Sequence, residues 1–259
     1  MNRPAPRLTA LLALALCSSP AGVRAELPFG VGERVTMRIT YARLLAGRAW
    51  VSVLPGEHEG RPVLRYEALA RSQGFFAWLF RFRVDVRTVA TWDPVSGCSL
   101  SIEKHLREGR AERDQVVLFD PARGTADVQD RKIDQTRFEV GPCALDVLSA
   151  FFATRIRGVP EEEPLNLPVF DNGKHYRLAV RFVERERLDL PPPLGKHVPT
   201  VVVEPQLLEG TGLFVKEGRL KIWLTDDARR IPVRMRSKVA IGSVSADLES
   251  YRPPAAGPP

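Results

Sequence analysis

The chain has 259 residues, of which 44% are hydrophobic and 27% charged, an ordinary balance for a globular protein with a real hydrophobic core. Its formal net charge of +7 comes from charges that alternate in sign, and no basic stripe of one sign is present to follow a phosphate backbone. Composition and charge therefore argue against nucleic-acid binding, and after residue 25 no apolar run has the length of a membrane-spanning helix.

The first 25 residues have the pattern of a secretory signal peptide. Arg3 and Arg7 give a positive start, Leu8–Leu16 form a short apolar run, and Val23–Ala25 offer the small residues that a signal peptidase reads. The run is too short for a transmembrane helix. We therefore expect cleavage near Ala25 and a periplasmic or secreted mature protein, whose net charge is lower by the three arginines of this segment.

Cys17 leaves an alternative for the localisation. Leu14–Cys17 resemble a lipoprotein box, in which a cysteine that becomes lipidated follows a small residue. Leu16 is bulky for that preceding position, so cleavage near Ala25 is the favoured prediction. Anchoring through a lipid on Cys17 is the second one.

Strict alternation of apolar and polar residues dominates the chain from residue 34 onward. It is clearest over Val35–Tyr41, Phe82–Val86, Tyr176–Phe182 and Ile231–Met235, where apolar side chains recur at every second position. Such a period, with one polar face, is typical of antiparallel strands that pack on one side only. Turn signals between the runs, such as Asp171-Asn172-Gly173, indicate a meander of roughly a dozen strands.

These patterns predict a mostly β fold, either one curved antiparallel sheet or a partly open β-barrel, with a single packed α-helix. We expect one β-rich domain over residues 26–252 and a disordered tail over residues 253–259. The Pro-rich stretch Leu188–Pro199 is interpreted as an extended loop and not as a domain linker, because strand-like segments continue on both sides of it.

Ala144–Arg157 is the one segment with helical periodicity. Leu145, Leu148 and Phe152 recur at helical spacing. Asp146 lies in the predicted first turn, where a carboxylate stabilises the positive end of the helix dipole. We expect the apolar stripe of this helix to cover the open face or one end of the sheet.

The run from Phe75 to Phe82 is the most unusual apolar feature of the sequence. It has two interpretations: core packing of a strand or short turn, or a lining for a hydrophobic ligand or lipid contact. Together with the helix it supplies the candidate ligand-binding residues, which are Phe75, Phe76, Trp78, Phe80, Leu148 and Phe152.

Cys98 and Cys143 are the two cysteines that remain after cleavage near Ala25. In an oxidising compartment such a pair invites a disulfide, which contributes about 4 kcal/mol in the chain-entropy model. The sequence alone does not show whether the two Cα atoms approach closely enough, so a disulfide and two free thiols both stay open.

No catalytic motif is found in the sequence. It lacks the G-x-S-x-G, Walker, G-x-G-x-x-G and H-E-x-x-H patterns, and its four histidines are scattered singly. Asp226-Asp227 is interpreted as the end of a hairpin, where carboxylates cap backbone amides, with cation binding as the alternative. We therefore expect no catalytic residues, no metal site and no cofactor.

Four segments carry a resemblance to a known family. They are the hairpin with Gly32-Glu33, Tyr41 and Gly47, the helix segment Asp146–Arg155, the segment Leu167–Lys174, and the hairpin Gly218–Gly242 with its Trp-Leu-Thr-Asp-Asp sequence. Together they resemble the exported bacterial family of domain-of-unknown-function 3108 over nearly the whole mature chain. The resemblance implies a secreted, β-rich, single-domain protein. The matching structural residues are Asp146, Trp223, Asp226, Asp227 and Pro232.

The last of these hairpins is also similar, more weakly, to the lipoprotein-carrier proteins, whose curved sheet wraps a helix and holds acyl chains. The expected function is therefore non-enzymatic binding of a hydrophobic or envelope-derived ligand, such as a lipid, between sheet and helix. The alternative is a structural or assembly factor that contacts an envelope protein or polysaccharide. The first hypothesis predicts a hollow beneath the helix, and the second a space filled by side chains. An enzyme acting on envelope polymers ranks third.

Overall fold

The computed structural model describes residues 27–73, 84–109, 111–130, 136–207, 220–238 and 242–255, and in these ranges the backbone forms fourteen strands and one α-helix. The first eight strands are β1 (Arg34–Tyr41), β2 (Leu44–His58), β3 (Arg61–Ser72), β4 (Val84–Trp92), β5 (Ser99–Glu108), β6 (Ala111–Asp120), β7 (Thr125–Gln129) and β8 (Arg137–Glu139). Helix α2 (Val147–Arg157) follows, and then β9 (Leu165–Asp171), β10 (Lys174–Leu188), β11 (Val198–Leu207), β12 (Leu220–Thr225), β13 (Pro232–Lys238) and β14 (Ser243–Arg252).

All fourteen strands belong to one sheet, in the order β8-β7-β6-β5-β4-β3-β2-β1-β14-β13-β12-β11-β10-β9. Each pair of neighbours is antiparallel, so the sheet consists of two meanders, β1–β8 and β9–β14, joined where β1 pairs with β14. The edge strands are β8 and β9, and the chain between them forms α2. The predicted open antiparallel sheet with a packed helix is confirmed.

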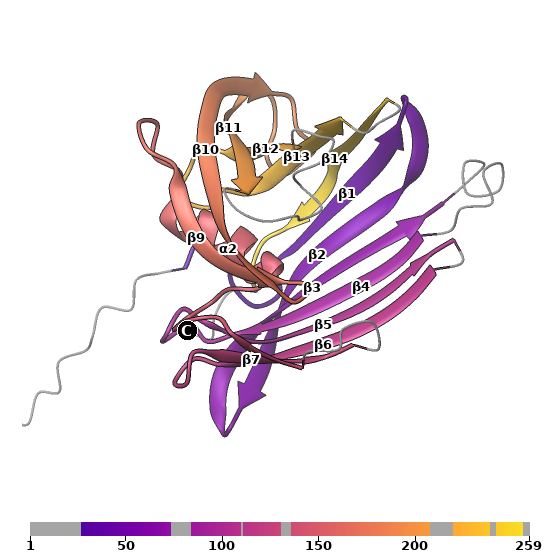
Figure 1. The fold of residues 1–259 in the computed structure, drawn as a ribbon. Helices are drawn as coiled ribbons and strands as arrows, with labels where there is room; N and C mark the ends of the chain where they lie inside the picture. Colours follow the sequence, from indigo (N-terminus) through magenta and orange to yellow (C-terminus); the bar gives the residue numbers. More distant parts are fainter. Residues whose placement is uncertain are drawn as a thin grey trace, which may run out of the picture.

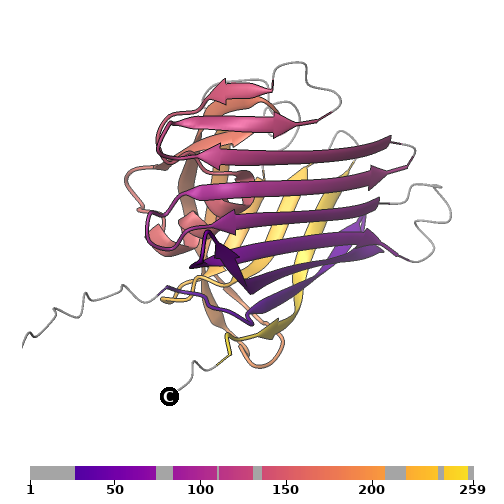
Figure 2. The same cartoon turned by 90° about the horizontal axis from the view of Figure 1, so that it is seen from below.

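The sheet bends so that its two halves face each other across α2 (Figures 1 and 2). On the side of the first meander, Phe152 of α2 stacks on Tyr66 of β3 with 3.8 Å between the ring centroids. On the side of the second meander, Phe151 packs against a cluster of apolar residues from β10–β12. The helix therefore lies inside the curve of the sheet. No helix of the described ranges is long and apolar enough to span a membrane.

The ends of α2 are set by two residues that differ in role. Asp146 is the N-cap: its extended backbone precedes the helix, and its side chain accepts hydrogen bonds from the N–H groups of Leu148 and Ser149. The sequence-based expectation started the helix at Ala144 and placed Asp146 in its first turn, but the observed helix starts three residues later, at Val147, and Asp146 precedes it. Gly158 ends the helix at φ 68° and ψ 174°, a conformation that is essentially restricted to glycine.

The two edge strands approach each other without pairing as strands. Leu145, just before α2, forms a parallel bridge with Val169 of β9 through two backbone hydrogen bonds of 2.9 Å. Phe138 of β8 packs on Phe170 of β9, with ring centroids 5.2 Å apart. Lys104 of β5 forms an ion pair with Asp171 of β9. Side chains and the entry to α2 therefore connect the two edges at these points.

Two segments outside the strands also pack in an ordered way. Leu190 and Leu194, in the loop between β10 and β11, contact a core cluster that contains Trp223 of β12. The expected disordered tail differs in its first residues: the N–H of Ala255 donates to the carbonyl of Val31 at 2.9 Å. Because β14 pairs with β1, the residues that follow β14 lie beside the residues that precede β1, and the two segments can form this backbone hydrogen bond. Residues 256–259 lie outside the described ranges.

Candidate functional site

An apolar cavity of about 180 Å³ lies between α2 and the strands β9–β13. The helix contributes Val147, Phe151 and Thr154, and the rest of the lining comes from apolar side chains on the facing strands and from Tyr176. The hydroxyl of Thr154 donates to the carbonyl of Ala150 at 3.0 Å, so this group is already satisfied within the helix. The wall therefore offers a ligand mainly hydrocarbon and aromatic surface.

The strand side of the cavity keeps several large apolar side chains partly exposed. Leu178 of β10, Pro205 and Leu207 of β11, Leu220 of β12 and Met235 of β13 line the cavity, and each is only half-buried. Large apolar side chains that line a hollow without filling it gain free energy when another apolar group covers them, at roughly 25 cal/mol per Å² of buried surface. This is the property expected of a hydrophobic binding site.

Tyr176 is the titratable group in the wall of this cavity. Burial raises the pKa of its phenol well above the ordinary value of 10.0, and the neighbouring Asp171 carboxylate acts in the same direction. The phenol is therefore neutral at any physiological pH. The described residues of the cavity wall therefore carry no charge that would oppose the entry of a hydrocarbon chain.

A second pocket, of about 390 Å³, lies at the C-terminal end of α2. It shares Val203 and Leu224 with the apolar cavity, so the two hollows adjoin. Its wall also carries charged side chains, which are Arg157, Arg185, Asp226, Asp227 and Arg230. The apolar cavity thus adjoins a pocket with a charged rim.

Both carboxylates of this rim already have cationic partners. Asp226 accepts from Arg185 at 3.0 Å, and Arg185 also pairs with Glu161. Asp227 accepts from the guanidinium of Arg229 at 2.6 Å and from the backbone N–H groups of Arg229 and Arg230. The hairpin role predicted for Asp227 agrees with this geometry. In the described ranges no group of three or more His, Cys, Asp or Glu side chains is placed to hold a metal ion.

The family model for proteins of unknown function DUF3108 matches residues 36–249 of this chain. The chain belongs to the DUF3108 family. A search of the curated proteins gives no significant match.

Among solved structures, this DUF3108 protein is similar to a beta-barrel-like protein of domain of unknown function DUF1849 from Brucella abortus. The TM-score is 0.56 at 11% identity, over 88% of this chain and 100% of the other. A DUF1089 family protein from Pseudomonas aeruginosa matches with a TM-score of 0.37 at 16% identity, over 71% of this chain and 87% of the other. The first likeness supports the barrel-like fold of the DUF3108 chain, and the second is too weak to carry an argument.

The candidate ligand residues predicted for the helix do not line the cavity of this DUF3108 protein. Phe152 is only 1% exposed and packs between Tyr66 and Phe29, while Leu148 packs against the same core. The cavity is lined instead by Val147, Phe151 and Thr154, which lie on a different face of α2. The two meanders enclose α2 from opposite sides. The residues with the clearest apolar periodicity, Leu148 and Phe152, lie on the face that packs against the first meander and not on the face that lines the cavity. The other candidates, Phe75, Phe76, Trp78 and Phe80, lie outside the described residues.

Two family-matching residues have structural roles next to the site. The indole N–H of Trp223, itself buried, donates to the carboxylate of Glu186 at 2.9 Å. Pro232 is buried at the start of β13, opposite a register shift between Trp223 and Leu224. Both residues fix the β12–β13 hairpin that carries Arg229, Arg230 and the turn aspartates.

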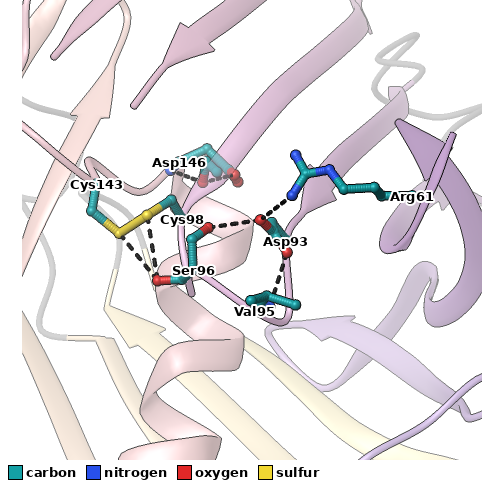
Figure 3. Close-up of a disulfide and its surroundings, with 8 residues drawn as sticks. Arg61, Asp93, Val95, Ser96, Cys98, Cys143 and Asp146 are labelled. Atoms are coloured by element: carbon teal, nitrogen blue, oxygen red, sulfur yellow. Dashed lines mark hydrogen bonds and ion pairs between the residues drawn. A yellow bond between two sulfur atoms is a disulfide. The ribbon is translucent and has the colours of Figure 1, made fainter. Parts of the chain in front are cut away.

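Cys98 and Cys143 form a disulfide in the structure (Figure 3). It joins the turn after β4 to the segment just before α2, a few residues from the N-cap Asp146. The turn is itself held by Asp93, which accepts from the N–H of Val95 and the hydroxyl of Ser96. The covalent link therefore fixes the start of the helix that forms the wall of the cavity.

One buried ion pair was not recognised from the sequence. Arg155 of α2 and Glu33, before β1, lie 2.6 Å apart and are 1% and 2% exposed. Arg155 also donates to the carbonyl of Arg229 at 3.0 Å and lies over the ring of Phe29. Both residues stand in family-matching segments, but 122 positions separate them, and periodicity gives no signal for such a pair.

Proposed function

We propose that this DUF3108 protein is an exported periplasmic protein that binds a hydrophobic ligand, without catalysing a reaction, in the cavity between α2 and β9–β13. The observation that carries the proposal is the cavity itself, which the described side chains line but do not fill. A protein that served only as a packed structural element would fill this space, because an unfilled apolar space forfeits packing and transfer free energy.

The construction of the fold supports the same function. The first meander packs densely against one face of α2 around Tyr66 and Phe152, and the disulfide fixes the start of the helix. The helix is therefore held in place independently of the cavity on its other face. A binding site whose walls are preformed loses less conformational entropy when the ligand enters.

The test is the binding of N-phenyl-1-naphthylamine, an uncharged probe that fluoresces in apolar surroundings. We expect saturable binding by the wild type and at least tenfold weaker binding by Leu178→Trp, because the larger side chain occupies the cavity; one or two lost apolar contacts of this size correspond to about tenfold or more. Val183→Trp is the matched control, since Val183 is an exposed residue of the same strand that does not line the cavity.

Binding that is unchanged in Leu178→Trp, or that is lost equally in Val183→Trp, contradicts the proposal. The cytoplasmic, periplasmic and membrane fractions of the cells are separated before purification, so that the location and the intact mass of the protein also report export. A mass that corresponds to cleavage near Ala25 is the expected result. Uncleaved protein in the cytoplasm contradicts the proposed localisation, and a lipid adduct on Cys17 selects the anchored alternative.

A further inference from the structure

We infer that the ligand is a single-chain amphiphile with an anionic head group, which lies against Arg157 and Arg230 while its chain extends along β11 toward Leu207. The inference rests on the proposed function and adds to it the chemical class and the orientation of the ligand. It is carried by the alignment of the two hollows and by the charges at one end of them.

One row of side chains on β11, which we call the track, lines both hollows. Val201 lines the charged pocket, Val203 lines both hollows, and Pro205 and Leu207 line the apolar cavity. Alternate residues of a strand share one face, so these four side chains form a row of roughly 20 Å, at about 3.4 Å per residue. A row of this length suits an extended hydrocarbon chain.

The neighbouring strands continue the same track. Phe182 of β10, Val203 of β11 and Ile222 of β12 are register partners across the sheet. Phe182 lines the charged pocket, and Ile222 lines the apolar cavity. The combined volume of the two hollows falls within the roughly 300–1,000 Å³ of small-molecule sites.

The charges at the rim leave two arginines for a ligand. Asp226 is balanced by Arg185, and Asp227 by Arg229. Within the part of the chain that the structure describes, the exposed Arg157 has no carboxylate partner, and the one acceptor of the Arg230 side chain is the carbonyl of Arg155, at 2.8 Å. A guanidinium has five N–H donors, so both arginines keep donors for an anionic group.

The backbone brings Arg230 to this position. The guanidinium of Arg230 lies against Gly158, so close that a Cβ added there would meet its nitrogen atoms at 3.1 Å. Glycine at the end of α2 thus admits the arginine beside the last helical turn, next to Arg157. At the opposite end of the track, near Leu207 and Leu220, the described residues of the wall are apolar side chains and Tyr176. A head group is stabilised at the arginine end and desolvated without compensation at the other, which fixes the orientation.

The experiment compares three ligands with the same chain: dodecanoate, dodecyl phosphate and dodecanol, each displacing N-phenyl-1-naphthylamine. We expect the wild type to bind dodecanoate, dodecyl phosphate or both about tenfold to a hundredfold more tightly than dodecanol, the range for a charge-assisted hydrogen bond. The ratio between the two anions distinguishes a carboxylate from a phosphate head group. In the double variant Arg157→Gln/Arg230→Gln, the affinities for dodecanoate and dodecyl phosphate should fall to within about twofold of the affinity for dodecanol. The affinity for dodecanol itself should not change.

The matched control is Arg177→Gln/Arg181→Gln, which removes the same charge from exposed positions of β10. These positions alternate with the cavity-lining residues Tyr176, Leu178 and Val180, so they face away from the track. Retained dodecanol binding in the site variant shows that its cavity is intact. Equal affinity for anions and alcohol in the wild type, or an anion preference that survives in the site variant, overturns the inference while the proposed function stands. If the probe binds but none of the three ligands displaces it, the inference is likewise overturned; if the probe itself does not bind, the proposed function fails.

Discussion

At the scale of single residues, the pair of Glu33 and Arg155 ties three distant segments together. The guanidinium of Arg155, on α2, pairs with the carboxylate of Glu33 in the N-terminal segment. It also donates a hydrogen bond to the carbonyl of Arg229 in the β12–β13 hairpin. A buried ion pair is weak evidence for net stabilisation, but removing one partner leaves an uncompensated buried charge. The pair therefore acts as a constraint on how these segments meet.

This predicts a specific pattern in the free energy of unfolding. Glu33→Gln should lower it by about 3–5 kcal/mol, and Arg155→Met by a similar amount, because each leaves one buried charge without its partner. Glu33→Gln/Arg155→Met should cost clearly less than the two single changes added together. Urea denaturation of the four proteins measures these values. Additive costs would show that the two side chains contribute independently.

At the scale of elements, the start of α2 depends on a carboxylate in a fully buried position. One oxygen of Asp146 accepts from two backbone N–H groups, and the other accepts from the hydroxyls of Ser99 and Ser149, both at 2.6 Å. Burial raises the pKa of this carboxyl above its ordinary value of 3.8, although the hydrogen bonds from Ser149 and Ser99 oppose the change. The cap is thus tied to β5 and sensitive to protonation.

The direction of this pKa shift predicts a pH dependence of stability. The folded protein holds the Asp146 proton at a pH where the unfolded chain has released it, so the free energy of unfolding falls as the pH rises from 3.8 through the raised pKa. Asp146→Asn keeps an acceptor oxygen for the helix N–H groups and does not titrate. Its stability relative to the wild type should therefore improve across this window. Urea denaturation at a series of pH values tests this, and a difference that is constant with pH would refute it.

The same elements show what the sequence can and cannot predict. Alternation in β1, β10 and β13 identified the strands, because one polar face leaves a period of two. The helix was also found, but not its orientation: Leu148 and Phe152 face the core while Phe151 faces the cavity. A helix enclosed by a curved sheet is apolar on two faces, and periodicity does not tell which one is packed and which one lines a hollow.

At the scale of the whole molecule, the two meanders differ in how they use the helix. The first meander packs against α2 in an aromatic core. Between the second meander and α2 lie the two hollows of the track, with Arg157 and Arg230 at one end and Leu207 and Leu220 at the other. Such a hollow depends on side chains from five strands that together fail to fill a space. No local pattern in the sequence shows whether side chains from distant strands fill the space between them. The cavity could therefore be recognised only in the structure.

The most direct test of this account is a crystal structure of the protein grown with 12-bromododecanoic acid. The anomalous scattering of bromine marks the end of the chain independently of how the rest of the ligand is interpreted. We expect the bromine in the apolar cavity, near Leu207 and Leu220, and the carboxylate within hydrogen-bond distance of Arg157 or Arg230. A bromine bound elsewhere on the protein, or no ordered bromine at saturating ligand, would contradict the central claim that this cavity binds a hydrophobic ligand.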